Sequence, residues 1–170
     1  MREKVLEAQI VPEVNVLIAV AKWLHLKGWQ IERASMPHGR GIDSVINRKK
    51  LEAELTSAGI PINNIKFMQA GEDIRARQGN NLWKIECKCL GSGKRTTDKN
   101  HFDRGVASIV SYYTQEEGLR LGLALPEGYE RYLKNKLPQA LREAINLWLF
   151  IYVSADDFLA VFEPEEELPL

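Results

Sequence analysis

The sequence predicts an α/β fold in which a mixed β-sheet is flanked by helices. Two observations support this prediction: a β-hairpin pattern lies near the middle of the chain, and the segments after it alternate between strand and helix. The chain of 170 residues is long enough to bury a sizeable core, and no repeat or low-complexity linker divides it. We therefore expect one domain over residues 1–170, with a core at about 12–162 and a frayed acidic tail at 163–170.

The first predicted element is an amphipathic helix. Pro12 is favoured in the first turn of a helix, and Gly28 is a stop signal, so we expect this helix to end at about Leu26. Apolar residues recur along it at helical spacing, which predicts that one face is buried. This apolar stripe consists of Val14, Leu17, Ile18, Ala21 and Leu24.

The other elements outside the hairpin are short. Before the hairpin we expect a strand over residues 29–34, a loop over 36–44, a helix over 48–58 and a strand over 65–68. After it we expect a helix over 102–115, a strand over 119–125, a helix over 129–145, and strands over 147–153 and 158–162. The helix after the hairpin has an apolar side formed by Phe102, Val106, Ile109, Val110 and Tyr113.

The hairpin has one apolar and one charged face. Side chains alternate along a strand, so Ile85 and Cys87 point to one face while Glu86 and Lys88 point to the other. The first strand, over residues 73–77, alternates in the same way. The apolar face predicts that the hairpin lies within a buried central sheet.

The turn of the hairpin sets which residues face each other. A two-residue loop at 79–80, with glycine supplying positive φ, places Asp73 opposite Glu86. A loop at 80–81 would shift the register by two and place Asp73 opposite Lys88 instead. The two carboxylates and the lysine cluster in either register.

This cluster predicts a metal site for phosphodiester hydrolysis. Opposed carboxylates have Cβ atoms roughly 5 Å apart, so their like charges are destabilising without a cation. Mg²⁺ prefers oxygen ligands and is commonly held by one or two carboxylates plus substrate phosphate, which suits Asp73 and Glu86 with Mg²⁺ or Mn²⁺. Lys88 is placed to stabilise charge on the phosphate or to orient water. The predicted catalytic residues are therefore Asp73, Glu86 and Lys88.

Asp73, twelve intervening residues and Glu86-Cys87-Lys88 together resemble the signature of the PD-(D/E)XK nuclease superfamily. The resemblance covers about residues 12–125 and implies a restriction-endonuclease-like three-layer fold. It also implies a metal-dependent endonuclease whose substrate is DNA. An acidic residue on the preceding helix is common in the family, which makes Glu13 a candidate third metal ligand. The alternative for Glu13 is that it complements the dipole of its helix.

Two positions depart from the family pattern. Glu72 stands where the family name has proline, a position that varies. Ser108 is the equivalent of a glutamine that many members have on the following helix, and it cannot replace that residue as an amide. An alternative function is therefore a catalytically inactive nucleic-acid-binding or assembly protein that keeps the nuclease fold. A third hypothesis is a surface salt-bridge network, in which the acids would point into open solvent.

Basic residues flank the hairpin. Residues 84–104 contain six Lys or Arg against three acids, although the net charge of the whole chain is zero. A local basic patch can bind a phosphate backbone even when the total charge cancels. An arginine in the first turn of the predicted helix would face the positive end of its dipole, so Arg104 needs an acid or a phosphate as partner. The candidate nucleic-acid-binding residues are Lys94, Arg95, Thr97 and Arg104.

Composition limits the compartment and the partners. No apolar run is long enough to span a bilayer and no signal peptide is recognisable, so we expect a soluble cytoplasmic protein. Cys87 and Cys89 lie two residues apart on one strand, where they cannot bond to each other, and both are expected to be reduced. A zinc site from these cysteines and His25, His38 or His101 lacks ligand-pair spacing. A homodimer would let a chain with one site cut both strands, but the sequence has no interface signature.

Overall fold

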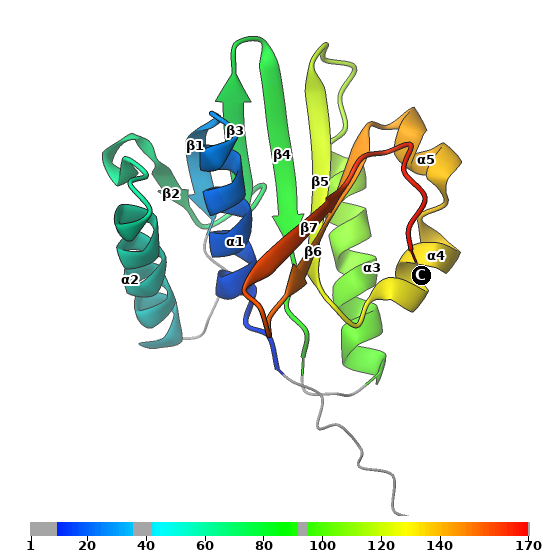
Figure 1. Cartoon of the computed structure of the whole chain (residues 1–170), viewed down its shortest axis with the longest axis horizontal. Helices are drawn as coiled ribbons and strands as arrows, with labels where there is room; N and C mark the ends of the chain where they lie inside the picture. Colours follow the sequence, from blue (N-terminus) through cyan, green and yellow to red (C-terminus); the bar gives the residue numbers. More distant parts are fainter. Residues whose placement is uncertain (1–9, 36–41, 92–94, 170) are drawn as a thin grey trace, which may run out of the picture.

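The structure is a computed structural model and describes residues 10–35, 42–91 and 95–169. Within these ranges, seven strands form one mixed sheet (Figure 1). The strands are β1 (Gln30–Ser35), β2 (Lys66–Met68), β3 (Ile74–Gln78), β4 (Asn81–Cys87), β5 (Leu119–Pro126), β6 (Leu147–Val153) and β7 (Phe158–Phe162). They lie in the order β2-β1-β3-β4-β5-β6-β7, so β4 is the middle strand.

The sheet combines antiparallel and parallel pairs. The pairs β1–β3, β3–β4 and β6–β7 are antiparallel. The pairs β1–β2, β4–β5 and β5–β6 are parallel. The parallel pairs in the centre require crossover helices, and these crossovers place helices over the faces of the sheet.

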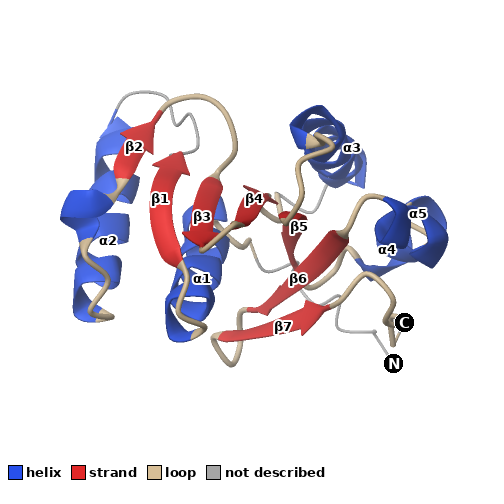
Figure 2. Cartoon of the chain, turned by 90° about the horizontal axis from the view of Figure 1, so that it is seen from above, coloured by secondary structure: helices blue, strands red, loops and turns tan. Residues whose placement is uncertain are grey.

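Helices cover both faces of the sheet (Figure 2). One face has a core with α1 (Glu13–Leu26) and α2 (Ile42–Ser57), and the other has a core with α3 (Arg95–Tyr112) and α4 (Glu130–Lys136). Two shorter elements are α5 (Gln139–Ala144), which packs beside β6, and the 3₁₀-helix η1 (Ile62–Asn64). The predicted α/β architecture, a mixed sheet between helices, is confirmed. In the described part of the chain, none of the helices is long and apolar enough to cross a membrane.

The first helix agrees with its prediction. Helix α1 begins directly after Pro12, and Gly28 follows its end with a φ of 80°. All members of the predicted apolar stripe are buried, and Val16 and Val20 are buried as well. The helix is therefore enclosed more fully than a single stripe implies, because it packs against several strands as well as α2.

Three helices differ from their predicted bounds. Helix α2 begins at Ile42 rather than residue 48, and the rest of the predicted loop, residues 36–41, lies outside the described residues. Helix α3 begins at Arg95 rather than Phe102. The prediction missed this start because the first turns of the helix are polar and show no apolar periodicity. The single helix predicted over 129–145 is two helices, α4 and α5. Pro138 separates them because it lacks an N–H and disfavours helical backbone at the residue before it.

Helix α3 is also less buried on its predicted apolar side than expected. Phe102 and Ile109 are buried, whereas Val110 and Tyr113 are exposed. Both exposed residues border an apolar pocket between α3 and the segment that includes α5. The prediction was wrong for these two positions because α5 is short and covers the end of α3 incompletely.

The C-terminal tail is anchored, which corrects the prediction that it is frayed. Arg142 of α5 is only 2% exposed. Its guanidinium donates hydrogen bonds to the backbone oxygens of Glu163, at 3.1 Å, and Glu166, at 2.7 Å. Pro164 is buried, and Leu168 packs against the core on the face that α3 and α4 cover. The tail is therefore an ordered segment whose four acids, Glu163, Glu165, Glu166 and Glu167, are exposed to solvent.

The middle strand is anchored at its start by an aromatic cluster. Trp83 of β4 is fully buried, and its ring makes edge contacts with Trp23, Trp29 and Trp148. The guanidinium of Arg120 lies over the rings of Trp29, Trp83 and Trp148 at 5.3–5.6 Å. These contacts fix β4 between its neighbours, so the residues at its other end are held on a rigid element.

Candidate active site

The hairpin has the register that places Asp73 opposite Glu86. Strands β3 and β4 pair Ile74 with Ile85 and Gln78 with Asn81, which leaves a two-residue loop. Gly79 in this loop has a φ of 57°, as the turn requires. The register expected from a loop at 79–80 is therefore confirmed, and the alternative shifted by two is excluded.

Asp73 stands directly before β3, and its side chain reaches across to β4. Its Oδ2 accepts a hydrogen bond from the backbone N–H of Cys87 at 2.7 Å. Its backbone oxygen accepts another from the N–H of Ser35 at 2.8 Å. Asp73 is thus fixed at both ends between the neighbouring strands β1 and β4.

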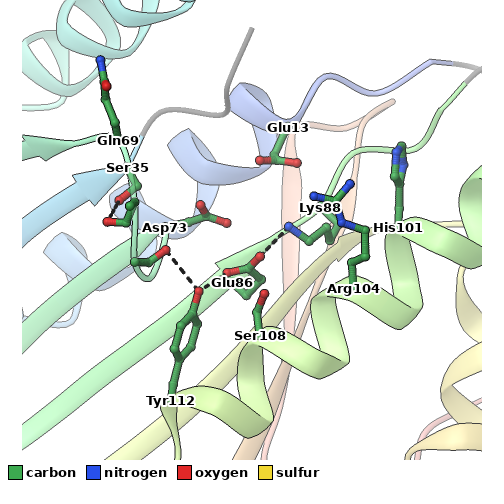
Figure 3. Close-up of a pocket in the computed structure, with 12 residues that line it drawn as sticks. Glu13, Ser35, Gln69, Asp73, Glu86, Lys88, His101, Arg104, Ser108 and Tyr112 are labelled. Atoms are coloured by element: carbon green, nitrogen blue, oxygen red, sulfur yellow. Dashed lines mark hydrogen bonds and ion pairs between the residues drawn. The ribbon is translucent and has the colours of Figure 1, made fainter.

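The alternation of β4 sends its side chains to the two faces as predicted. Ile85 and Cys87 are fully buried in the core that contains α1. Glu86 points toward α3, and Lys88, directly after the strand, points to the same side (Figure 3). Because both faces of the central strand are covered, the charged side chains are enclosed rather than placed on an open surface.

A cleft of about 350 Å³ lies where the strands β1 and β4 end, and its walls come from several elements. Asp73, Glu86 and Lys88 all line it, and so does Glu13 from the first turn of α1 (Figure 3). The structure therefore brings the three predicted catalytic residues and the predicted third acid into one cavity. The salt-bridge hypothesis required acids in open solvent without a cleft, and this arrangement contradicts it.

The acids of the cleft are buried. Glu86 is 5% exposed and Asp73 is 8% exposed. The buried polar side chains of the described residues are Ser35, Glu72, Asp73, Glu86 and Arg142, and three of these line the cleft. Burying a charge is costly unless it is paired, hydrogen-bonded or bound to a metal. Such a concentration of buried acid in one cavity is typical of a functional site.

Both oxygens of Glu86 have donors. Lys88 Nζ forms an ion pair with Oε1, and the hydroxyl of Tyr112 lies 2.6 Å from Oε2. The same hydroxyl lies 3.1 Å from the backbone oxygen of Gly71. The carboxylate is therefore held in one orientation from two sides.

Two acids of the cleft, Asp73 and Glu13, have raised pKa values. Burial raises the pKa of Asp73 well above its ordinary value, and the charges of Glu86 and Glu13 raise it further. Burial also raises the pKa of Glu13, although attraction to Lys88 opposes the shift. Glu13, Asp73 and Glu86 therefore lie close enough together for their charges to interact, and a cation would relieve this repulsion.

Lys88 remains a cation in this site. Burial works to lower its pKa, but attraction to Glu86 and Glu13 outweighs burial, so the net shift of the pKa is upward. A lysine with a raised pKa is protonated at neutral pH and is a poor general base. The geometry therefore favours an electrostatic role for Lys88.

Glu72, in the position of the family's proline, is also buried but has compensating charges. It forms an ion pair with Arg75 and lies 3.8 Å from Arg33 Nη1. Its backbone oxygen accepts a hydrogen bond from the hydroxyl of Ser35 at 2.8 Å. Two arginines therefore balance the single charge of Glu72. In the cleft the ratio is reversed, because three acids share the cations Lys88 and Arg104.

The donor set of the cleft fits a hard divalent cation. In the described part of the chain, no three His, Cys, Asp or Glu side chains form a complete ligand cage for an ion. Mg²⁺ does not need such a cage, because it keeps several waters and binds substrate phosphate alongside one or two carboxylates. Asp73 and Glu86 supply these two carboxylates, and Glu13 supplies a third oxygen donor at the same cavity.

The predicted nucleic-acid-binding residues fall in different places. Arg104 lines the cleft, but it lies well inside α3 and not in its first turn, so the argument from the helix dipole was wrong. Arg95 and Thr97 lie at the start of α3, with Arg95 exposed to solvent. Lys94 lies outside the described residues.

Helix α3 contributes residues that sequence reasoning missed. His101 and Tyr112 line the cleft together with Arg104 and Ser108, and Ser108 occupies the position of the family's common glutamine. The four residues are spaced three, four and four apart, which places them on one face of a helix. This polar stripe is visible in the sequence, but the apolar residues on the same helix give a stronger periodic signal.

The cysteines are free, as predicted. Cys87 is buried in the core, and Cys89 Sγ lies 3.4 Å from Nδ1 of His101. Burial raises the pKa of both thiols, so both are in the neutral form at neutral pH. The contact between Cys89 and His101 holds the imidazole at the rim of the cleft.

Comparison with known proteins adds no relative. Neither the models of known protein families nor the curated proteins nor the solved structures include a match to this chain.

Proposed function

We propose that this protein is a metal-dependent endonuclease of the PD-(D/E)XK superfamily that hydrolyses phosphodiester bonds in DNA. The observation that most supports this proposal is the meeting of buried Asp73 and Glu86 with Lys88 in one cleft. The acids lie on a hairpin whose register opposes them, and the cleft is open to a ligand. Spacing in the sequence and position in space thus agree for the same three residues.

The arrangement of elements supports a restriction-endonuclease-like three-layer fold. The hairpin β3–β4 lies at the centre of a mixed sheet, with α1 before it in the chain and α3 after it. The helices pack on opposite faces. The first helix brings Glu13, and the second brings a polar stripe, to the same cleft.

Each residue has a role that follows from its surroundings. Asp73 and Glu86 would hold Mg²⁺ or Mn²⁺, with Glu13 as a third oxygen donor. The metal, when bound, polarises a phosphoryl oxygen and lowers the pKa of a coordinated water. Lys88, a half-buried ammonium beside Glu86, stabilises negative charge that develops on the phosphate. Arg104 at the wall of the cleft binds a phosphate of the nucleic-acid backbone.

A nicking assay on supercoiled plasmid tests this function. The wild type is expected to convert the plasmid to open-circular or linear DNA with Mg²⁺ or Mn²⁺ and to leave it intact with EDTA. Asp73→Ala, Glu86→Ala and Lys88→Ala should each lower the rate by 100-fold or more, on the order of losses from removing a transition-state donor. Asp103→Ala is the matched control, since Asp103 is an acid of α3 that pairs with Lys99 and Lys136 outside the cleft. Cleavage that all three site variants retain would overturn the assignment.

The alternative is a nucleic-acid-binding or assembly protein that has lost catalysis. Ser108 favours it, because a short hydroxyl stands in the cleft where many members of the superfamily have an amide. This alternative predicts that the wild type shifts DNA or RNA in a gel at low salt but leaves both substrates uncut with either metal. The same plasmid assay, run beside the gel shift, separates the two functions.

A further inference from the structure

We propose that Tyr112 is a positioning residue that orients the Glu86 carboxylate for cation binding. This inference rests on the proposed function, because it assigns a role toward the metal that Asp73 and Glu86 would hold. It concerns a residue on α3, far from the hairpin in the sequence.

The contact is direct and has a defined direction. The hydroxyl of Tyr112 donates to Glu86 Oε2 at 2.6 Å, since a carboxylate is an acceptor only. Lys88 Nζ holds the other oxygen, Oε1. A carboxylate with a donor on each oxygen cannot rotate freely, so its remaining lone pairs face the cleft and Asp73 in a fixed arrangement.

Tyr112 is itself held against β4 at two points. It is the last residue of α3, and its backbone oxygen accepts a hydrogen bond from Lys84 Nζ at 3.2 Å. Lys84 and Glu86 are two residues apart on β4 and therefore point to the same face. The strand thus binds both the backbone and the hydroxyl of Tyr112, and the phenol ring has little freedom to swing away. The hydroxyl also lies 3.1 Å from the oxygen of Gly71, in the segment that leads to Asp73.

Hydrogen bonds to metal-ligating carboxylates matter because they set the geometry of the ligand. Residues that orient a ligand in this way typically change metal affinity or activity by about 10- to 100-fold when removed. Glu86 has a single tyrosine donor, and phenylalanine keeps the ring while deleting only the hydroxyl. The chain also offers a matched control, because Tyr113 is the next residue, is 45% exposed and does not line the cleft.

The test measures Mn²⁺ binding to metal-free protein by electron paramagnetic resonance, without any nucleic acid. Tyr112→Phe is expected to weaken the affinity for Mn²⁺ by about 10-fold, whereas Tyr113→Phe should bind as the wild type does. Equal affinity in Tyr112→Phe and the wild type would overturn the inference while leaving the proposed function intact. A wild type that binds no Mn²⁺ would overturn both.

A second measurement asks whether Tyr112 acts through Glu86. Thermal unfolding in EDTA is compared for the wild type, Tyr112→Phe, Glu86→Ala and the double variant. If the hydroxyl acts on Glu86, Tyr112→Phe lowers the Tm in the wild-type background and has a much smaller effect in the Glu86→Ala background. The same shift in both backgrounds would assign the hydroxyl to the Gly71 oxygen and would contradict the positioning role.

Discussion

The carboxylate of Asp73 lies in surroundings that disfavour its charge. It is buried, accepts one backbone hydrogen bond, and faces Glu86 and Glu13 across the same cleft. Burial and these two charges raise its pKa, so its ionised form is destabilised in the folded protein without a cation. A residue in this condition is expected to weaken the metal-free protein and to bind a metal.

We predict that Asp73→Asn stabilises the metal-free protein at neutral pH by about 1 kcal/mol, a typical gain from relieving an unfavourable functional site. Asparagine keeps an oxygen that can accept from the Cys87 N–H and removes the charge. Thermal unfolding in EDTA measures the effect. Asp103→Asn is the control, because Lys136 and Lys99 lower the pKa of Asp103 and its ionised form is favourable. A lower Tm for Asp73→Asn than for the wild type would contradict the prediction.

The raised pKa of Asp73 leads us to predict that the stability of the metal-free protein depends on pH. A raised pKa in the folded state means that the protonated form contributes stability below the pKa of the unfolded chain, about pH 4 for aspartate. This contribution is lost as the pH rises through the higher pKa of the folded state. The Tm advantage of Asp73→Asn should therefore be small near pH 4 and grow toward pH 8. An advantage that shrinks as the pH rises would show that Asp73 is stabilised when charged.

At the scale of elements, α3 positions the site from the side opposite the hairpin. Its polar stripe lines the cleft, and Tyr112 contacts Glu86. Gly105, inside this helix, is buried, and a Cβ built there would lie 3.2 Å from Lys88 Cγ and 3.1 Å from Leu123 Cδ1. Glycine in a helix interior costs about 1 kcal/mol relative to alanine. The close approach explains why the helix has glycine here: the stem of Lys88 occupies the space of a side chain.

We predict that Gly105→Ala lowers the cleavage rate by roughly 10-fold or more, because small displacements of a catalytic group are costly. The added methyl pushes the stem of Lys88 away from its place beside Glu86. The Tm should change little, since the gain in helix propensity offsets the tight contact. Plasmid nicking and thermal unfolding measure the two effects. Asn100→Ala, at an exposed position of the same helix, should leave the rate unchanged. An unchanged rate in Gly105→Ala would show that Lys88 adjusts freely.

At the scale of the whole molecule, the C-terminal tail after β7 is bound to helix α5. Arg142 is a buried cation whose hydrogen bonds go to backbone oxygens of the tail, and its Nε has no partner within the described residues. Burial lowers the pKa of this guanidinium. Arg142 therefore has a structural role, because it holds the segment after β7 against α5.

We predict that Arg142→Met destabilises the protein by about 2 kcal/mol, because the tail oxygens that Arg142 satisfies lose their donor. Urea unfolding measures the loss, and cleavage after the tail glutamates by a glutamate-specific protease reports release of the tail. Lys134→Met, an exposed change on α4, is the control. Tail cleavage at the wild-type rate in Arg142→Met would show that the tail is held by packing alone.

The sequence predicted the hairpin and its acids well because their signals are local. Strand alternation acts over a few residues and fixes which face Glu86 and Lys88 occupy, and the Gly79 turn limits the hairpin to two registers, one of which the structure has. The start of α3 and the break at Pro138 were missed for the opposite reason. The first turns of α3 are polar and give no periodic apolar signal. The apolar periodicity over residues 129–145 continues across Pro138, so it predicted one helix instead of two.

The sequence by itself determined the α/β class, two possible registers of the hairpin and the grouping of Asp73, Glu86 and Lys88, and the structure selected the register that opposes Asp73 to Glu86. Only the tertiary structure decided that Glu13, Arg104 and Tyr112 reach the same cleft, that Gly105 makes room for Lys88, and that the tail is anchored. Periodicity and turn chemistry specify neighbours along one strand pair. The angle at which a helix crosses the sheet depends on packing over both cores, and that angle determines which side chains from distant segments meet.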